Sequence, residues 1–305
     1  MSKALSAFFS NDRAYITVVN RNEKGMELLY VNSTESLIDL EDINGEESLT
    51  GRAELNQIFE EIGEVDEANV ALPAESVIVS QFPYRSTIKE IEIRYLVELE
   101  IKNVYPLFNF DDFSVELIPF GLSEWMMAVL IPNFLLKTVK ELLAPVEIPI
   151  KHIDISQINA HSAFLFNYPE DRGKLIAIFN VQDRFIDISV VNGEQPEYYN
   201  LLSYNSPEEI SEKVAHEFDR IAKKMKKQPV ASYFFGSAIT RTSMLNCWEA
   251  AMERGIEAKR LNAFRMMSSK LGARERAYCA RVFHLFPPCV GAAIPTYHHR
   301  KKIIK

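Results

Sequence analysis

The residues most suggestive of chemistry lie at a polar corner between two apolar runs. Residues 175–191 read LIAIFNVQDRFIDISVV, and the corner separates two strand-like halves. A hairpin that grips phosphate needs a glycine, so that backbone N–H groups can approach the anion, and an acid that organises a divalent ion. Asn180 and Gln182 stand at those two places. The pattern therefore raises nucleotide hydrolysis as a function while lacking the residues that would perform it.

Two further corners have a related composition. Ser10 and Asp12 lie between two apolar runs near the N-terminus, and Gly236 and Ser237 follow the apolar run 230–235. An acid at Asp12 would repel phosphate. The sequence after the glycine lacks the G-x-S-x-G spacing of a nucleophile elbow. We therefore expect no catalytic residue at either corner.

The polar residues of the second corner also have structural interpretations. Asn180 could hold water or a metal weakly, or it could favour the turn through local hydrogen bonds, which is the interpretation that we prefer. Asp183 and Arg184 could form an anion site or a solvated ion pair of little energetic value. Asp187 lies in an alternating strand and could be an acid that faces the cleft, but in this pattern we expect it to face solvent or a donor on a neighbouring strand.

Composition narrows the function classes. The chain has 305 residues, a formal net charge of -8 and a pI of about 5.4, which argues against a globally basic nucleic-acid binder. No apolar run is long enough to span a bilayer. The three cysteines form no CxxC pair, and no histidine has metal-ligand spacing, so we predict free thiols, a reducing cytoplasm and no metal site.

Alternating and helical patterns predict the elements that position these corners. The predicted strands are Leu5–Phe9, Ala14–Asn20, Met26–Val31, Asn69–Leu72, Ser76–Phe82, Phe113–Ile118, Trp125–Ile131, Lys151–Ile155, the two runs of 175–191, Glu197–Tyr204, Val230–Phe235 and Ala258–Leu261. The predicted helices are Glu47–Ile62, one behind a capping box of Thr87 and Glu90, one capped by Asn133, Ala160–Phe166, one starting at Ser206-Pro207, Ser243–Arg254 and about Arg274–Phe286. A β-β-β-α unit thus occurs early and again late, around a small α+β unit with a core of its own.

This order of elements resembles the actin-like ATPase superfamily, and within it the PilM family, the cytoplasmic actin-like component of type IV pilus assembly, with FtsA as a more distant relative. Val70–Pro73 followed by Ser76–Val79 is similar to the entry into the inserted subdomain of PilM. Met127–Pro132 is similar to its strand before a capped helix, Ile186–Val190 to its "TDLSV" strand, and Gly236 to its adenosine loop. The resemblance implies an α/β, actin-like (ribonuclease H-like) two-lobed fold with an inserted α+β subdomain.

The same resemblance implies a division of the chain. Residues 1–72 plus 147–166 would form the first actin-like half, residues 73–146 the inserted α+β subdomain, and residues 167–305 the second half. The second half would end in a short basic tail that contains Arg300, Lys301, Lys302 and Lys305.

The departures from the family carry the functional argument. In actin-like ATPases two hairpins and a glycine-rich loop hold the nucleotide. The residues that the resemblance places there are Ser10, Asp12, Asn180, Gln182, Asp183, Gly236 and Ser237. Because the acid is absent and long side chains replace glycines, we expect a degenerate site, no cofactor, and Mg–ATP binding that is poor or absent.

We therefore expect a non-catalytic scaffold that is cytoplasmic and binds a protein partner. Working as PilM relatives do, it would bind the cytoplasmic segment of an inner-membrane protein in a pilus- or secretion-type assembly, and would be peripheral to that membrane. The peptide groove would lie between the inserted unit and its parent lobe. The alternatives are an active but divergent actin-like ATPase or kinase, and an uncharacterised bacterial actin-like protein unrelated to pili.

Two surfaces have open interpretations. Phe108, Phe110 and Phe113 could line a peptide-binding surface, because aromatic anchors dominate recognition, or they could staple a loop to the core of the inserted unit. The basic tail could contact anionic lipid, RNA or an acidic partner, or it could be an unstructured solubilising segment, which is the interpretation that we prefer.

Overall fold

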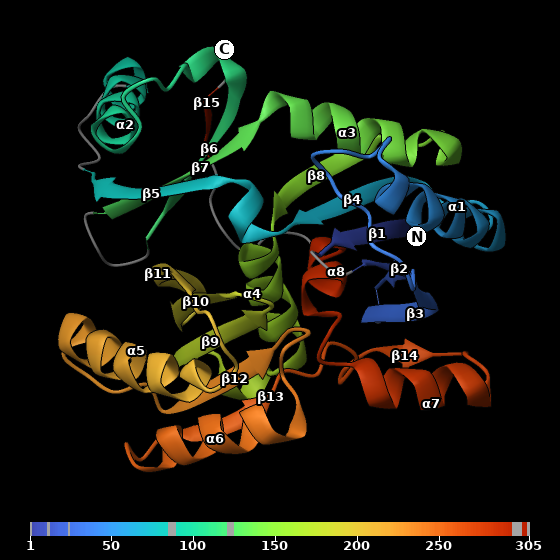
Figure 1. Cartoon of the computed structure of the whole chain (residues 1–305). Coiled ribbons are helices and arrows are strands. Elements are labelled where there is room, and N and C mark those ends of the chain that lie inside the picture. Colours follow the sequence, from blue (N-terminus) through green and yellow to red (C-terminus); the bar gives the residue numbers. More distant parts are fainter. Residues whose placement is uncertain are drawn as a thin grey trace.

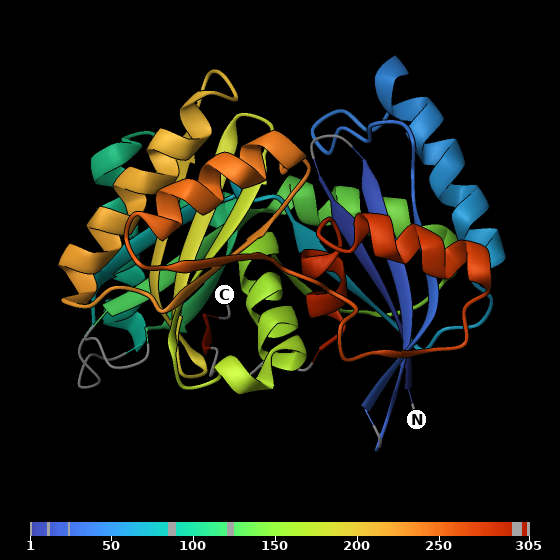
Figure 2. The same cartoon turned by 90° about the horizontal axis from the view of Figure 1, so that it is seen from below.

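Two lobes lie side by side, with α4 (Ser156–Asn167) and α8 (Pro287–Ala292) between them (Figure 2). The computed structural model describes residues 2–10, 13–23, 25–84, 90–120, 125–294 and 301–303. Within these residues the strands form three sheets, of six, five and four strands. Each lobe contains one of the two larger sheets, and the smallest belongs to the inserted unit (Figure 1).

The first lobe is built on a mixed sheet with strand order β14-β3-β2-β1-β4-β8. Its strands are β1 (Ser2–Phe9), β2 (Ala14–Asn22), β3 (Gly25–Ser33), β4 (Glu67–Leu72), β8 (Ile150–Ile155) and β14 (Ser268–Ser269). The first three strands pair antiparallel, whereas β4 and β8 continue the sheet in parallel to β1. One face packs on α1 (Glu46–Glu61), and the other on α8 and α7 (Ala273–Val282). Since both faces are covered, the strand β1 is almost wholly buried.

The second lobe repeats this pattern with strand order β11-β10-β9-β12-β13. Its strands are β9 (Leu175–Gln182), β10 (Phe185–Asn192), β11 (Gln195–Ser203), β12 (Ala231–Phe235) and β13 (Glu257–Arg260). Again three antiparallel strands are followed by parallel ones. Helices α5 (Glu209–Met225) and α6 (Arg241–Met252) cover one face, and α4 covers the other. The repeated β-β-β-α unit predicted from the sequence is confirmed.

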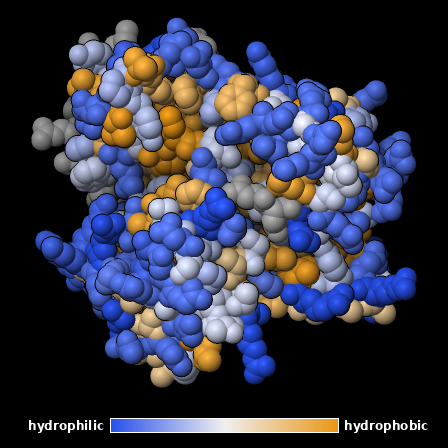
Figure 3. Space-filling view, viewed as in Figure 1, coloured by the Kyte–Doolittle hydropathy of each residue, from blue (hydrophilic) through white to orange (hydrophobic). Residues whose placement is uncertain are grey.

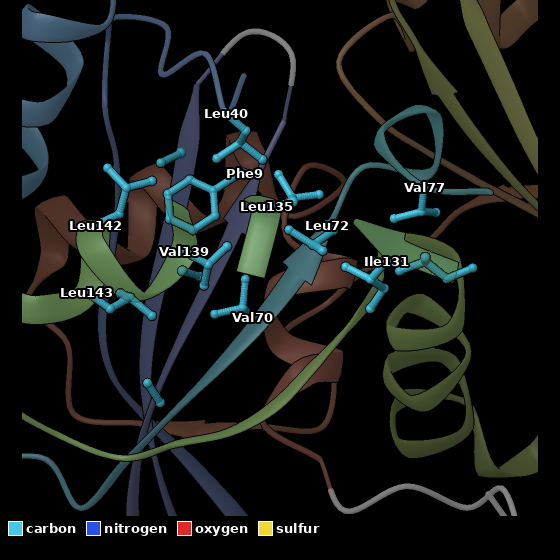
Figure 4. Close-up of a cluster of buried hydrophobic side chains, with 14 of the residues drawn as sticks. Phe9, Leu40, Val70, Leu72, Val77, Ile131, Leu135, Val139, Leu142 and Leu143 are labelled. Atoms are coloured by element: carbon cyan, nitrogen blue, oxygen red, sulfur yellow. The ribbon is translucent and has the colours of Figure 1, made fainter. Parts of the chain in front are cut away.

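The inserted unit joins the first lobe through a shared core. Its sheet, in the order β15-β6-β7-β5, contains β5 (Ile78–Pro83), β6 (Phe113–Pro119), β7 (Trp125–Pro132) and β15 (Lys301–Ile303). α2 (Glu90–Val104) covers one face and forms a separate core with it. The side chains of α3 (Asn133–Leu143) instead point toward Phe9 and Val70 of the first sheet (Figure 4). The unit therefore has only part of its core to itself, and the boundaries at 73 and 146 remain a prediction.

Several predicted helix ends are displaced in the structure. Pro132, not Asn133, precedes α3, and the Asn133 amide donates to the Asp111 carbonyl oxygen (2.8 Å) instead of capping the helix. α5 begins three residues after Ser206, because its first turn is closed by tighter bonds such as the one from Ile210 N–H to the Pro207 carbonyl. Thr87 of the predicted capping box lies outside the described residues. Short 3₁₀ turns occupy Ala74–Ser76, Phe110–Asp112, Ala144–Val146 and Pro169–Asp171.

The end of the chain departs most from the prediction. The single helix expected to Phe286 is wrong: α7 ends at Val282, and a second helix, α8, follows the buried Phe286 ring. Two prolines start α8, since proline is favoured in the first turn of a helix. Residues 301–303 form β15, which pairs antiparallel with β6, so this part of the basic tail is not an unstructured segment. Arg300 and Lys305 lie outside the described residues.

Candidate functional site

Three polar corners meet in the cleft between the lobes. Ser10 follows β1 of the first lobe, and Gln182 ends β9 of the second. Gly236 and Ser237 follow β12, which lies parallel to β9, so the carboxyl ends of both strands reach the same edge. The sequence predicted these corners separately, and the fold brings them within hydrogen-bonding distance. Asp12 lies outside the described residues.

A chain of side-chain hydrogen bonds fills this meeting point. The Oε1 atom of Gln182 accepts from Ser237 Oγ at 2.8 Å and from Ser10 Oγ at 3.4 Å. Its Nε2 donates to Asn180 Oδ1 at 2.7 Å, and Asn180 Nδ2 donates to Ser156 Oγ at 3.5 Å. Ser10, Asn180 and Gln182 are buried. The two carboxamides thus bond to the protein itself, and neither supplies a negative charge for a cation.

Gly236 closes the cleft from the side of β12. Its φ is +112°, and a Cβ atom there would lie 2.3 Å from the Val181 carbonyl oxygen and 2.8 Å from Asn180 Oδ1. The following loop is fixed by a bond from Ala238 N–H to the same carbonyl oxygen (3.1 Å). Only glycine permits this conformation and this approach. Here the glycine allows β12 to pack against the hairpin strand.

Asp187 carries the acidic group at the inner end of the network. It lies opposite Asn180 in the β9–β10 register, is 2% exposed, and accepts a hydrogen bond from Ser156 Oγ at 3.5 Å. Burial raises the pKa of this carboxyl group to about 8, and the charge of Glu75 adds to the effect, although hydrogen bonding to Tyr199, Asn180 and Ser156 opposes it. Burial, together with the charge of Asp187, also raises the pKa of Tyr199. Asp187 therefore faces donors on the neighbouring strands β9 and β11, one of the two expected surroundings, and not solvent.

Asp183 and Arg184 form the tip of the hairpin, outside the network. Their side chains are 82% and 80% exposed and lie 3.9 Å apart. Arg184 has a φ of +67°, and its carbonyl oxygen accepts from Tyr204 N–H at 2.9 Å. The pair is therefore a solvated corner whose backbone geometry would suit glycine.

Sequence reasoning missed Ser156 and did not favour a place in the site for Asp187. Ser156 begins α4, four residues before the predicted start, and joins the two amides to the carboxyl group. Asp187 could have been found from register: a two-residue turn that pairs Gln182 with Phe185 must pair Asn180 with Asp187. Nothing in the sequence marks Ser156, because its role depends on how α4 sits between the lobes.

The phenylalanine cluster belongs to the core of the inserted unit. Phe108 and Phe110 are buried, with ring centroids 6.0 Å apart, and Phe113 packs 4.8 Å from Phe108. The Arg94 guanidinium covers the Phe110 ring at 4.6 Å. This placement corresponds to the structural interpretation, in which the rings staple the loop to the core, and leaves two of them little surface for a partner.

Hollows adjoin the inserted unit on several sides, and one of about 280 Å³ lies between Ser10, Asp39 and Glu75. A groove of about 300 Å³ lies between α2 and β5 on one side and β11 on the other. It is lined by Ala74, Val77, Ile78, Val79, Ser80, Gln81, Glu100, Ile101, Val104, Tyr105, Tyr199, Asn200 and Leu201. Apolar side chains gather in a hollow of the surface between these parts (Figure 3). A further hollow of about 300 Å³ lies between the end of α3 and β8, where Lys140 and Glu147 face it.

Both walls of the first groove are edges of sheets. β5 ends the inserted sheet, and β11 ends the second-lobe sheet. One contact already joins them: Gln81 Nε2 donates to the Tyr199 carbonyl oxygen at 2.8 Å. Val104 and Tyr105 at the rim are 69% and 51% exposed. Within the described residues, the groove therefore combines the edge strands of two sheets with exposed apolar side chains.

Within the described part of the chain, no group of three or more His, Cys, Asp or Glu side chains could hold a metal ion. Among the same residues, no helix combines the length and the apolar character that crossing a membrane requires.

Comparison with known proteins identifies the fold. The sequence matches no protein-family model and no curated protein. A structure of the PilM–PilN type IV pilus biogenesis complex is similar to this chain, with a TM-score of 0.67 and 16% identity. The match covers 95% of this chain and 97% of that one. A Bacteroides thetaiotaomicron VPI-5482 protein with an actin-like ATPase fold and unknown function has a TM-score of 0.52 and 12% identity, covering 87% of this chain and 94% of that one.

A third similar structure is the cytoplasmic domain of EpsL, an inner membrane component of the type II secretion system of Vibrio cholerae. It has a TM-score of 0.51 and 10% identity, over 83% of this chain and 95% of that one. The chain therefore has the actin-like ATPase fold, as the repeated halves indicate, and the predicted structural likeness to PilM is confirmed.

Proposed function

We propose that this protein is a non-catalytic adaptor that uses the actin-like fold to bind a protein partner. The observation that carries the proposal is the closed network from Ser10 through Gln182 and Asn180 to Ser156. In the fold's family, the equivalent corners hold phosphates and a divalent ion. Here the same corners bond to one another.

Charge and space both act against Mg–ATP in this cleft. Asn180 and Gln182 are neutral, so neither offers the carboxylate oxygen that a magnesium ion prefers. Asp187 offers one, but its raised pKa keeps much of the carboxyl group protonated near neutral pH. To admit a phosphate at this corner, Gln182 would have to leave Ser237 and Asn180. We therefore propose that the protein neither binds nor hydrolyses ATP to a useful extent.

The class of partner follows from the similar structures. One is a complex of PilM with PilN, and another is the cytoplasmic domain of an inner-membrane secretion component. We extend this to our chain as a proposal: its partner is the cytoplasmic segment of an inner-membrane protein in a pilus- or secretion-type assembly, and the protein itself is cytoplasmic.

The groove between β5 and β11 is the surface that best suits such a segment. Its two strand edges can accept main-chain hydrogen bonds from an extended peptide, and Val104 and Tyr105 can cover apolar side chains. Its position differs from the expected one, because its second wall belongs to the second lobe and not to the parent lobe.

Calorimetric titration with ATP and Mg²⁺ tests the proposal. The wild type should give no saturable heat. A variant with Asn180→Asp and Gln182→Gly restores the acid and the glycine. A matched control with Asn192→Asp and Gln195→Gly makes the same two changes at the other end of β10, where β10 ends and β11 begins. Binding by the first variant alone would support an eroded phosphate site. Mg-dependent binding by the wild type would overturn the proposal in favour of a divergent ATPase.

A further inference from the structure

The edge of β11 turns main-chain groups into the β5–β11 groove. In an antiparallel ladder, a residue that does not bond to its partner strand points its N–H and C=O groups away from that strand. Tyr204 N–H bonds to the Arg184 carbonyl oxygen, which fixes the bonded pairs of β10 and β11 at every second residue from there. Tyr199 and Leu201 fall between those pairs. Their main-chain groups therefore point out of the second-lobe sheet, toward the inserted unit (Figure 1).

The edge of β5 does the same from the opposite wall. Phe120 N–H bonds to the Trp125 carbonyl oxygen, and this fixes which residues of β7 bond to β6. The partners of those residues on β5 include Val79 and Gln81, which are left outside the ladder between β7 and β5. Both walls therefore line the groove with outward main-chain groups.

One amide of the protein itself already bonds to the edge of β11. Gln81 Nε2 donates to the Tyr199 carbonyl oxygen at 2.8 Å, which is the length of a bond in a β-ladder. The donor thus lies where the N–H group of an added strand would lie. A side chain supplies one such bond, whereas a strand continues to the next outward residue, Leu201. Among the described residues, no hydrogen bond reaches Leu201 from the inserted unit.

The side chains around the groove define what the ligand must carry. Val104 and Tyr105 of α2 are largely exposed at the rim and suit apolar side chains. Within the described chain, Glu100 is the one charged residue that lines the groove, and it is exposed and belongs to no ion pair. A lysine or arginine of the ligand would complement Glu100. Cytoplasmic segments beside a membrane span are enriched in these two residues.

We propose that the groove binds an extended, basic segment of the partner as a strand added to the edge of β11, and that Gln81 holds this place in the free protein. The inference rests on the proposed function, since it gives the form and charge of the segment that the adaptor binds. Main-chain bonds to Tyr199 and Leu201 supply affinity, and Glu100 selects a basic side chain. Because the ligand must displace Gln81, that contact is autoinhibitory.

Fluorescence anisotropy of the full chain with a labelled nine-residue peptide tests strand addition. The peptide alternates valine and threonine around a central lysine, and two further versions carry N-methyl groups on its odd or on its even positions. The parent should bind, and one methylated version should bind about tenfold more weakly than the other, because an added strand bonds through every second residue. Equal affinities of the two versions would overturn strand addition, as would a parent peptide that does not bind.

Substitutions of the two side chains test their roles. Gln81→Ala should tighten binding of the parent peptide by about threefold or more, since no internal bond must be displaced. A Gln81 that only supports the wall would give weaker binding instead. Glu100→Lys should weaken binding by about tenfold and favour a peptide with a central glutamate. Glu60→Lys makes the same charge change on α1, outside the groove, and should alter neither affinity.

Two results distinguish this binding mode from the adaptor function. Peptide binding that neither Gln81→Ala nor Glu100→Lys changes would overturn the binding mode and leave the adaptor function standing. Mg-dependent ATP binding by the wild type would overturn the adaptor function whether or not the peptide binds. Thermal unfolding checks that each variant is folded, and Glu100→Lys, at an exposed position, decides if Gln81→Ala fails to fold.

Discussion

The interlobe cleft and the β5–β11 groove are both formed where separate parts of the chain meet, but they are filled differently. In the cleft, polar side chains from both lobes bond to one another, and Ser10, Asn180, Gln182 and Asp187 are buried. In the groove the Gln81 side chain donates to the opposite wall, and the apolar side chains of Val104 and Tyr105 stay exposed. The cleft therefore links the two lobes through side-chain hydrogen bonds, whereas the groove keeps apolar side chains exposed.

The difference teaches that polar corners and strand edges meet their hydrogen-bonding needs in different ways. Gln182 Nε2 donates to Asn180 Oδ1, so part of the hydrogen-bonding capacity of these two carboxamides is satisfied within the cleft. An exposed strand edge has no such internal solution, because its backbone groups point away from their own sheet. Four predictions test this contrast, in order of decreasing effect.

Gly236→Ala should have the largest effect, since it forces a Cβ atom against the Val181 carbonyl oxygen in a conformation that alanine avoids. We expect a loss of about 2–5 kcal/mol in the free energy of unfolding, measured by urea denaturation. Gly255→Ala is the matched control: its φ is +70°, but nothing lies within 4 Å of the added atom, so it should lose only about 1–2 kcal/mol. Equal losses would mean that the close contact with β9 costs nothing.

Asp187→Asn should stabilise the protein most at higher pH. The folded-state pKa of Asp187, about 8, lies above the value of about 4 expected in the unfolded chain, so the folded state holds a proton that the unfolded state releases. The stability of the wild type should therefore fall as pH rises from about 4 to 8, by up to about 1.4 kcal/mol per pH unit from this group.

The window from pH 7 to 8 isolates this effect. Burial lowers the pKa of His284 to about 4, so that histidine acts on stability in the opposite direction but only at lower pH, up to about 6.5. Urea denaturation of both proteins at pH 7 and 8 checks the prediction. A wild-type slope equal to that of Asp187→Asn would mean that the carboxyl group is already ionised in the folded protein.

Gln182→Ala should lower the free energy of unfolding by about 1–3 kcal/mol. The change removes the oxygen that accepts from Ser237 Oγ and the N–H that donates to Asn180 Oδ1, and it leaves those polar atoms unpaired in the cleft. The same change at Gln195, which lies at the start of β11, should cost less than about 0.5 kcal/mol. Amide hydrogen exchange in β1 and β9 should also rise in Gln182→Ala, if the network holds the lobes together. Unchanged exchange would limit the role of Gln182 to its own lobe.

Val104→Ser combined with Tyr105→Ser should have the smallest effect on folding, within about 0.5 kcal/mol, because both side chains are largely exposed at the rim of the groove. Thermal unfolding checks this prediction. A large loss of stability would show that the rim belongs to the core of the protein and would weaken its assignment as a binding surface.

Local sequence signals were sufficient for most elements. Alternation and apolar runs located the strands of both large sheets except β14 to within a few residues, because a half-buried or buried strand must carry such a pattern. The stripe of Ile210, Val214, Phe218 and Ile221 likewise identified the buried face of α5. α8 was missed because its six residues are too short for a periodic pattern and are fully buried from all sides.

The sequence by itself determined the chemical character of the corners: Asn180 and Gln182 lack charge, and Gly236 permits a backbone that no other residue adopts easily. Only the tertiary structure decided that these residues bond to one another, that Ser156 joins them, and that the Asp187 carboxyl group is buried. The physical reason is distance along the chain. Ser10 and Gln182 are 172 residues apart, and no local pattern encodes a contact that depends on how two lobes and the helix between them pack.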